Sequence, residues 1–377
     1  MMEAYDRFEL LINDRVVKTP VAIASMAGIV DAAYVLERAA HVGVAFIGGY
    51  SIDAPTLEAS RKMAAEGRKE FLYDDPIEAL EQEVNALKQS DVVTGLNLRG
   101  STPAAYAEVA AAFEDQVVYE IDAHCRQPAM LEAGCGEYLL KNPAKLVEII
   151  RALKAEDVTV SVKMRAGVAN DADLARTVWK AGADILHVDL MDFGHVRLRQ
   201  IRNASPLMLI ANNSINTFDR AMNAFSHGAD LVSLARQSDP WTLAGLDAAI
   251  TRFADECGWY NAPKQLCRGG DIRSLAFCCM PVKACPLIPA LQKFGLSREE
   301  YLKLKQEAVK GTPLDGGKTT CFGGLAWCCK ISSPCMFRNM TLEKIDLSPR
   351  EYMRCKRRLS EQIVHRIFEE ESADESS

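Results

Sequence analysis

Eight short apolar runs alternate with stretches of helical periodicity over residues 1–250, and this alternation constrains the fold more than any other feature. The helical stretches include 104–113, 143–154 and 173–181. Parallel strands joined by helices form either a closed (β/α)8 barrel or a doubly wound open sheet. The open sheet normally carries a glycine-rich phosphate loop after an early strand. No such loop is present, so the pattern predicts a barrel with strands at 21–25, 44–48, 92–98, 117–122, 159–164, 185–190, 207–211 and 231–235.

The remainder of the chain has a different composition. Ten of the twelve cysteines lie at or beyond Cys257, and residues 251–377 carry a net charge of +4 whereas residues 1–250 carry −11. We therefore expect three parts: a barrel domain over 1–250, a small, mainly α-helical, cysteine-rich metal-binding domain over 251–368, and a disordered acidic tail over 369–377. A basic surface in the second part can bind RNA or an acidic protein.

No apolar run reaches the ~18 residues that a membrane span requires. The acidic N-terminus does not have the basic and then apolar pattern of a signal peptide. Both observations favour a cytoplasmic protein without a membrane partner.

The active site of a (β/α)8 barrel lies where the strands end. The fourth predicted strand ends at Asp122, and His124, Cys125 and Cys135 follow it. A carboxylate, an imidazole and a thiol at this end can supply a base, a proton shuttle and an acid or nucleophile. The structural alternative is a capping aspartate above buried thiols.

The fifth predicted strand carries Lys163 and Arg165, which share one face because side chains alternate along a strand. That face points either into the barrel or toward the outer helices. Two buried cations at the active end would need an anion such as a phosphate or a reduced flavin ring. His187 and Asp189 occupy the matching positions on the sixth strand, where either a structural or a binding role fits.

Loops after the last two strands usually bind phosphate in such barrels. Asn212, Asn213 and Ser214 begin a turn whose N–H groups can bind an anion, and Arg236 beside Ala235 can add a charged fork.

Six ordered segments resemble tRNA-dihydrouridine synthases and dihydroorotate-dehydrogenase-like flavin barrels. They are SMAGIVD (25–31), LNLRGSTP (96–103), EID…P…G…LL (120–140), VKMRAGV (162–168), ANNSI (211–215) and GADLVSLAR (228–236). The resemblance implies FMN, with Lys163 stabilising the reduced flavin, and a tRNA or small-molecule substrate. The residues it implies for the cofactor are Met26, Ala27, Gly28, Lys163, Asn212, Asn213, Ser214, Ala235 and Arg236, and we add Asn97, Arg165 and His187 as candidates on neighbouring strands.

One motif departs from that family. The synthases place Asn-x-Gly-Cys-Pro after the fourth strand, and its cysteine protonates the pyrimidine. Here the segment reads His124-Cys125-Arg126-Gln127-Pro128, so Gln127 takes the position of the catalytic cysteine. We expect Cys125, with His124, to transfer the substrate proton, or Cys135 to have taken over that role.

The second part contains an internal repeat. AFCCMPVKACP (276–286) is matched by AWCCKISSPC (326–335), 50 residues further along, and each copy has a leading cysteine. Each copy also precedes a Ser-x-x-Glu capping box, at Ser297 and at Ser348. Four cysteines per copy is the number that commonly binds a metal. The predicted ligands are Cys267, Cys278, Cys279 and Cys285 in the first copy and Cys321, Cys328, Cys329 and Cys335 in the second.

Three kinds of cysteine site compete for this repeat. Zinc sites normally use Cys-x2-Cys pairs, which are absent, and disulfides suit a secreted chain. Adjacent cysteines more readily serve different metals of a polynuclear cluster. We therefore expect two iron–sulfur clusters of the [4Fe–4S] kind, with the first ligand of each copy free to exchange between copies, and zinc as the alternative.

The paired aromatic-Cys-Cys-x5-Cys motifs resemble the cysteine-rich domain of the methanogenesis marker protein 9 family, a group confined to methanogenic archaea. That resemblance implies an oxygen-free cytoplasm and a redox or methanogenesis-enzyme partner. The combined prediction is an FMN-dependent oxidoreductase with iron–sulfur clusters. The alternative is a non-catalytic barrel whose metal-binding module acts as an assembly or nucleic-acid-binding factor.

Overall fold

The computed structural model describes residues 4–191, 193–282, 285–316 and 319–374. Its contacts divide the chain into two compact units, the first formed by residues 1–224 and 229–251 and the second by 225–228 and 252–377. Within the described ranges no helix is both long and apolar enough to cross a membrane.

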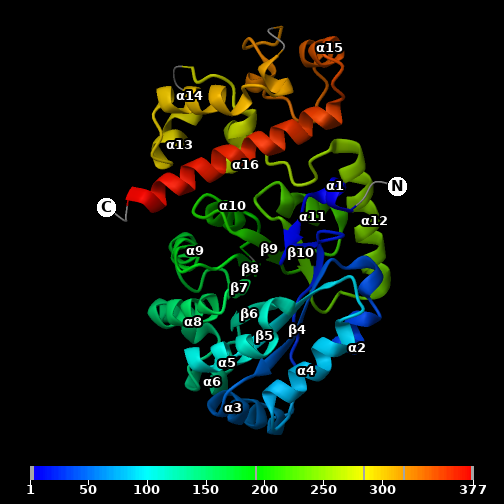
Figure 1. Ribbon diagram of the computed structural model, residues 1–377, viewed down its shortest axis with the longest axis vertical. Coiled ribbons are helices and arrows are strands. Elements are labelled where there is room, and N and C mark those ends of the chain that lie inside the picture. Colours follow the sequence, from blue (N-terminus) through cyan, green and yellow to red (C-terminus); the bar gives the residue numbers. More distant parts are fainter. Residues whose placement is uncertain (1–3, 192, 283–284, 317–318, 375–377) are drawn as a thin grey trace. The chain divides into compact units, whose positions relative to one another are not determined.

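The first unit is a closed barrel of eight parallel strands in the order β10-β3-β4-β5-β6-β7-β8-β9, with helices around it (Figure 1). All eight predicted strands are confirmed. β4 extends three residues past its predicted end because a register shift at Gly48 and Tyr50 lets it continue along β5. The strands are β3 (Val21–Ile23), β4 (Val44–Ser51), β5 (Val93–Arg99), β6 (Val118–Ala123), β7 (Val160–Arg165), β8 (Ile185–Asp189), β9 (Met208–Asn212) and β10 (Leu231–Leu234).

Helices follow the strands as the periodicity predicts. Many begin at a side-chain cap or a proline in the first turn, which satisfies or removes N–H groups that the helix itself leaves unpaired. A short helix and an antiparallel hairpin, α1 (Ala4–Phe8), β1 (Leu11–Ile12) and β2 (Arg15–Val16), precede the barrel. The barrel helices are α2 (Ala32–Leu36), α3 (Ala54–Ala65), α4 (Pro76–Leu87), α5 (Pro103–Phe113), α6 (Pro128–Glu132), α7 (Glu137–Lys141), α8 (Pro143–Ala155), α9 (Asp171–Lys180), α10 (Val196–Arg202), α11 (Phe218–Phe225) and α12 (Pro240–Cys257).

The second unit is mainly helical. Its long helix α16 (Pro349–Asp374) packs against the 3-10 turn η4 (Ile272–Phe277), α14 (Arg298–Val309) and α15 (Met336–Lys344) (Figure 1). Its other elements are α13 (Leu287–Lys293) and the 3-10 turns η3 (Leu266–Arg268), η5 (Pro313–Asp315) and η6 (Leu325–Trp327). Both predicted capping boxes are present, at Ser297 and Glu300 and at Ser348 and Glu351.

The acidic C-terminal segment starts as a helix, whereas the sequence predicts a disordered tail from residue 369. Helix α16 continues past Glu369 to Asp374, since an established helix gains one hydrogen bond for each residue added. Nδ1 of His365 lies 3.1 Å from Oε2 of Glu369, and this contact between side chains one turn apart further stabilises the helix. Residues 375–377 lie outside the described residues.

Candidate functional site

Asp122, at the end of β6, organises the mouth of the barrel. Its Oδ1 accepts the backbone N–H groups of His124 and Cys125, both at 2.9 Å, and its Oδ2 accepts Nε of Arg99 at 3.0 Å. Burial alone raises the pKa of Asp122, but Arg99 and the hydrogen bonds outweigh burial and hold that pKa below its ordinary value. The charged carboxylate therefore fixes the start of the loop that carries His124.

The His124 side chain lies at the mouth of the barrel, where it contacts the carboxylate of Asp189. Its Nε2 lies 2.7 Å from Oδ2 of Asp189, and Nη2 of Arg165 lies 3.3 Å from the same nitrogen. Arg165 is also paired with Glu137 at 3.0 Å, so its positive charge is already partly neutralised. Burial raises the pKa of Asp189, but the hydrogen bond with His124 outweighs it and lowers that pKa. The His124 side chain is 28% exposed, so its imidazole is accessible from the mouth.

The two barrel cysteines lie in different surroundings. Cys125 is 8% exposed and belongs to an apolar cluster with Ala59 and Met63 of α3 and Ala129 and Met130 of α6. Cys135 is fully buried, with its thiol 3.9 Å from the carbonyl oxygen of Asp122. Burial raises the pKa of both thiols, well above the ordinary value for Cys135. Both cysteines therefore remain protonated thiols.

Lys163 connects β7 to the segment after β3. Its side chain is buried, and its Nζ donates a 2.8 Å hydrogen bond to Oγ of Ser25, which immediately precedes Met26, Ala27 and Gly28. Gly28 has φ +68°, and a Cβ there would lie 2.6 Å from the backbone nitrogen of Glu70. Only glycine fits this turn. The lysine and the Met-Ala-Gly segment are thus brought together, as the flavin-barrel resemblance implies.

The loops after β9 and β10 present an open cationic end. Asn213 and Ser214 both have left-handed backbone conformations, with φ of +97° and +56°. Successive residues of this kind can turn their N–H groups toward one anion. Arg236 is exposed, and its side chain has no hydrogen-bond partner in the described part of the chain. Asn212 instead bonds to the backbone and hydroxyl of Ser233.

A polar network lies deeper in the barrel, and sequence reasoning missed its centre, Glu120. Glu120 accepts Nδ2 of Asn97 at 2.8 Å and contacts Nδ1 of His187 at 2.7 Å, while Nε2 of His187 contacts Ser233 at 2.7 Å. Both nitrogens of His187 are therefore already engaged, and Glu120 and His187 are fully buried. The signal for Glu120 was available, because it lies two residues before Asp122 and so shares its inward face.

Arg99 and Glu70 were also missed. Arg99 joins Asp122 to Glu70, its Nη1 lying 2.6 Å from Oε2 of Glu70, and the Glu70 side chain is fully buried. Glu70 belongs to the loop after α3, far from β5 in sequence, so no local pattern predicts this pairing.

The comparison with known families agrees with this geometry. The dihydrouridine synthase (Dus) family profile matches residues 75–267, just over half of the 377 residues. The chain belongs to the dihydrouridine synthase family. The expectation of a synthase-like barrel is confirmed at this level.

Three curated proteins are similar to parts of the chain. It is 31% identical over 192 residues to the tRNA-dihydrouridine(20/20a) synthase of Xanthomonas axonopodis pv. citri, covering 43% of this chain and 56% of that one. An uncharacterized protein of Methanocaldococcus jannaschii is 51% identical over 107 residues, covering 28% of this chain and 69% of that one. A second uncharacterized protein of the same organism is 26% identical over 230 residues, covering 57% of this chain and 88% of that one. The chain spans only about half the length of the named synthase.

A solved structure supports the fold of this dihydrouridine synthase family member. DHODH from Eimeria tenella, crystallised in complex with ferulenol, matches with a TM-score of 0.50 at 14% identity, over 66% of this chain and 84% of that one. At this identity the likeness shows the barrel fold.

The cysteine module adds a second candidate site to this family barrel. One cavity of about 50 Å³ is lined by Cys267, Cys278, Cys279 and Cys285, which is the whole predicted first ligand set, and also by Cys329 from the second copy. Cys321, Cys328 and Cys335 are not among its lining residues. Across the described ranges, no three His, Cys, Asp or Glu side chains are arranged as a ready-made metal site.

Matched tyrosines and lysines on α14 and α16 support the Cys-Cys turns of the two repeats. The hydroxyl of Tyr301 donates to the carbonyl of Leu275 at 3.0 Å, and that of Tyr352 to the carbonyl of Cys328 at 3.3 Å. Four residues after each tyrosine comes a fully buried lysine, Lys305 or Lys356. Sequence analysis missed these lysines, although each keeps the 51-residue spacing of the capping boxes.

Each lysine also contacts the opposite repeat. Nζ of Lys356 donates to the carbonyls of Ala276 and Ala326, at 2.8 and 2.9 Å, which are equivalent positions in the two copies. Nζ of Lys305 lies 4.9 Å from the ring centre of Trp327. The ammonium groups therefore join the two Cys-Cys turns to each other.

Proposed function

We propose that the barrel is an FMN-dependent reductase of the dihydrouridine synthase class in which His124, oriented by Asp189, handles the substrate proton. The observation that carries the proposal is the 2.7 Å contact between His124 and Asp189 at the mouth of the barrel. Gln127 replaces the proton-donating cysteine of the family motif, so a residue other than 127 has to supply the proton.

The residues present fit FMN. Lys163 donates to a neutral hydroxyl, that of Ser25, and its ammonium group would face the anionic ring. The left-handed pair Asn213 and Ser214, together with the unpaired Arg236, suits a phosphate group. Met26, Ala27 and Gly28 lie beside Lys163 and would support the ring, with Ala235 next to the phosphate.

The chemistry then divides between cofactor and chain. Reduced FMN, once bound, would supply the hydride for a carbon–carbon double bond and would itself become oxidised. Lys163 favours the electron-rich ring by its charge, and His124 delivers the proton that completes the reduction. Asp189 stabilises the protonated imidazole and fixes its orientation. Uridine in tRNA and a smaller unsaturated substrate remain the two substrate classes that we propose.

Anaerobic purification tests this function. The protein should carry flavin absorption bands and release one FMN per chain on denaturation, and a uracil-containing substrate should reoxidise the reduced flavin. Dihydrouridine in tRNA treated with the reduced protein would identify the substrate class. A folded protein that neither retains nor takes up FMN would overturn the proposal and favour the non-catalytic alternative.

We also propose that the cysteine module holds an iron–sulfur centre and passes electrons. The observation favouring it is the gathering of five thiols around one cavity. Iron and acid-labile sulfide in the anaerobic protein would support the proposal, whereas zinc alone would overturn it. The association with methanogenesis stays a prediction, because neither uncharacterized relative has a name that states an activity.

A further inference from the structure

The five thiols around the 50 Å³ cavity come from both repeats. Cys278 and Cys279 follow η4, Cys267 lies in η3, and Cys285 precedes α13, all in the first copy. Cys329 belongs to the second copy and follows η6. A site assembled from one copy alone would not place Cys329 here.

Two lysine side chains lie buried next to the cysteine turns. Lys305 and Lys356 are both fully buried, and their ammonium groups bond to backbone carbonyls and, for Lys305, to the hydroxyl of Tyr301 at 3.1 Å. Within the described residues neither lysine forms an ion pair with a carboxylate. The lysines instead bond to the backbone of the cysteine turns: Nζ of Lys305 donates to the carbonyl of Cys278, and Nζ of Lys356 donates to the carbonyl of Ala326, two residues before Cys328.

A buried charge without a counter-charge is costly, by several kcal/mol per ion. Neutral carbonyls solvate an ammonium group but do not cancel its charge. Thiolates bound to a metal are permanently deprotonated, so they can supply the missing negative charge without titrating. Lysines at these positions are therefore placed to balance the negative charge of a metal–thiolate centre.

We propose that the two repeats jointly form one metal–thiolate centre, in which Cys329 joins Cys267, Cys278, Cys279 and Cys285, and that Lys305 and Lys356 balance its negative charge. The inference rests on the proposed metal content of the module and replaces two independent four-cysteine sets by one shared site. The ligand class is a thiophilic metal, either iron with sulfide or zinc.

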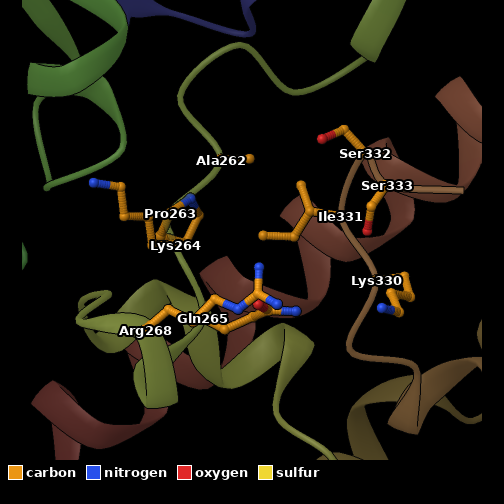
Figure 2. Close-up of a pocket in the computed structure, with 9 residues that line it drawn as sticks. All are labelled: Ala262, Pro263, Lys264, Gln265, Arg268, Lys330, Ile331, Ser332 and Ser333. Carbon is orange, nitrogen blue, oxygen red and sulfur yellow. The ribbon is translucent and has the colours of Figure 1, made fainter.

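A larger cavity of about 340 Å³ shares one lining residue with the thiol cavity. Gln265 lines both, and its side-chain amide donates to the carbonyl of Cys329. Figure 2 shows Gln265 and Arg268 side by side on one wall of the larger cavity. Nζ of Lys264, which also lines the larger cavity, lies 3.4 Å from Nε2 of His227.

Paired cysteine variants of the full chain test the shared site. Wild type, Cys278→Ser, Cys329→Ser and the double variant are reconstituted anaerobically with ferrous iron and sulfide, or with Zn²⁺ alone, and bound metal is counted. One shared site predicts that each single variant loses the same metal and that the double variant loses no more. Cys355→Ser, outside the repeat, should keep the wild-type metal content.

The outcomes separate the two proposals. Additive losses in the double variant would overturn the shared site while leaving a metal-binding module. A wild-type protein that binds neither iron nor zinc would overturn both.

Lysine variants test the counter-charge. Lys356→Met and Lys305→Met keep most of the side-chain volume but remove the charge, and each should weaken metal binding about tenfold or more. The readouts are competition with a chelator and the metal-dependent rise in Tm, with circular dichroism to confirm folding. The matched control is Lys303→Met, because the Lys303 side chain on the same helix α14 is 77% exposed. Unchanged metal affinity in a folded Lys305→Met protein would overturn the role of the buried charge.

Discussion

Nε2 of His124 lies 2.7 Å from Oδ2 of Asp189, and this contact joins the loop after β6 to the end of β8. The pairing gives the barrel a proton-transfer group at a point where the family's cysteine is absent. The sequence offers both His124 and Cys125 as the group that transfers the substrate proton. Their surroundings differ, because His124 contacts a carboxylate and Cys125 packs in an apolar cluster.

Replacing His124 by Gln should slow substrate-dependent reoxidation of the reduced flavin by about 10²–10⁴-fold, the usual contribution of general acid–base catalysis. Asp189→Asn should reduce the same rate by misorienting the imidazole. Stopped-flow absorbance measures the rate, and FMN content should stay unchanged in both variants.

Cys125→Ala provides the contrast. The thiol packs among Ala59, Met63, Ala129 and Met130, so its loss should lower the stability of the protein by about 1 kcal/mol while turnover stays near that of wild type. If Cys125→Ala abolished turnover in a protein of wild-type stability, the proton would have to come from the thiol.

Lys163→Met should weaken FMN binding by about 10- to 100-fold, the usual loss when a hydrogen bond from a charged group is removed. Titration of the apoprotein with free FMN, followed by quenching of flavin fluorescence, measures the change. Lys88→Met, at the exposed end of α4, should bind FMN as wild type does. Equal affinities in the two variants would exclude Lys163 from the cofactor site.

Asp122 should make the barrel sensitive to acid. Its folded-state pKa is lowered, so its contribution to stability is complete above the ordinary carboxyl pKa of about 3.9 and is lost as pH falls through the lower folded value. Asp122→Asn leaves Arg99 without one of its two carboxylates and should cost about 3–5 kcal/mol at neutral pH. Urea unfolding at successive pH values should show the difference from wild type shrinking below about pH 4.

The control for that experiment is Glu148→Gln on the exposed face of α8. Its stability should follow wild type at every pH. A difference between Asp122→Asn and wild type that stayed constant down to pH 2–3 would show that the carboxylate is not held ionised by Arg99.

Gly136→Ala should destabilise the loop beneath Asp122 by about 2–4 kcal/mol. Gly136 has φ +69°, and a Cβ would lie 2.1 Å from the carbonyl oxygen of Cys125. Gly245→Ala in helix α12 meets no atom within 4 Å and should be neutral or stabilising. Thermal unfolding of both proteins compares the two, and equal Tm values would show that the loop can relax around the new methyl group.

The strands were predictable because a buried parallel strand leaves a local signature, a short apolar run between helical segments. Alternation placed Lys163 and Arg165 on one face of β7, and the bond from Lys163 to Ser25 after β3 shows that the lysine points into the barrel. Pairings across the barrel were not predictable: the partner of Arg99 is Glu70, and the partner of His124 is Asp189, 65 residues away. Local sequence cannot report which loops meet at the mouth.

The cysteine repeat shows the same division. Its spacing predicted two copies and both capping boxes, because these are local patterns. It also suggested two separate ligand sets, whereas Cys329 lies with the cysteines of the first copy. Nothing in the spacing of a duplicated motif says whether its copies bind side by side or around a common centre.

The hydrogen bonds from Lys356 to Ala276 and Ala326 make the interior of the cysteine repeat common to both copies. Because one buried ammonium group donates to equivalent turns of the two copies, removing either copy would leave it with only one of these carbonyl partners. Neither copy therefore satisfies this lysine by itself.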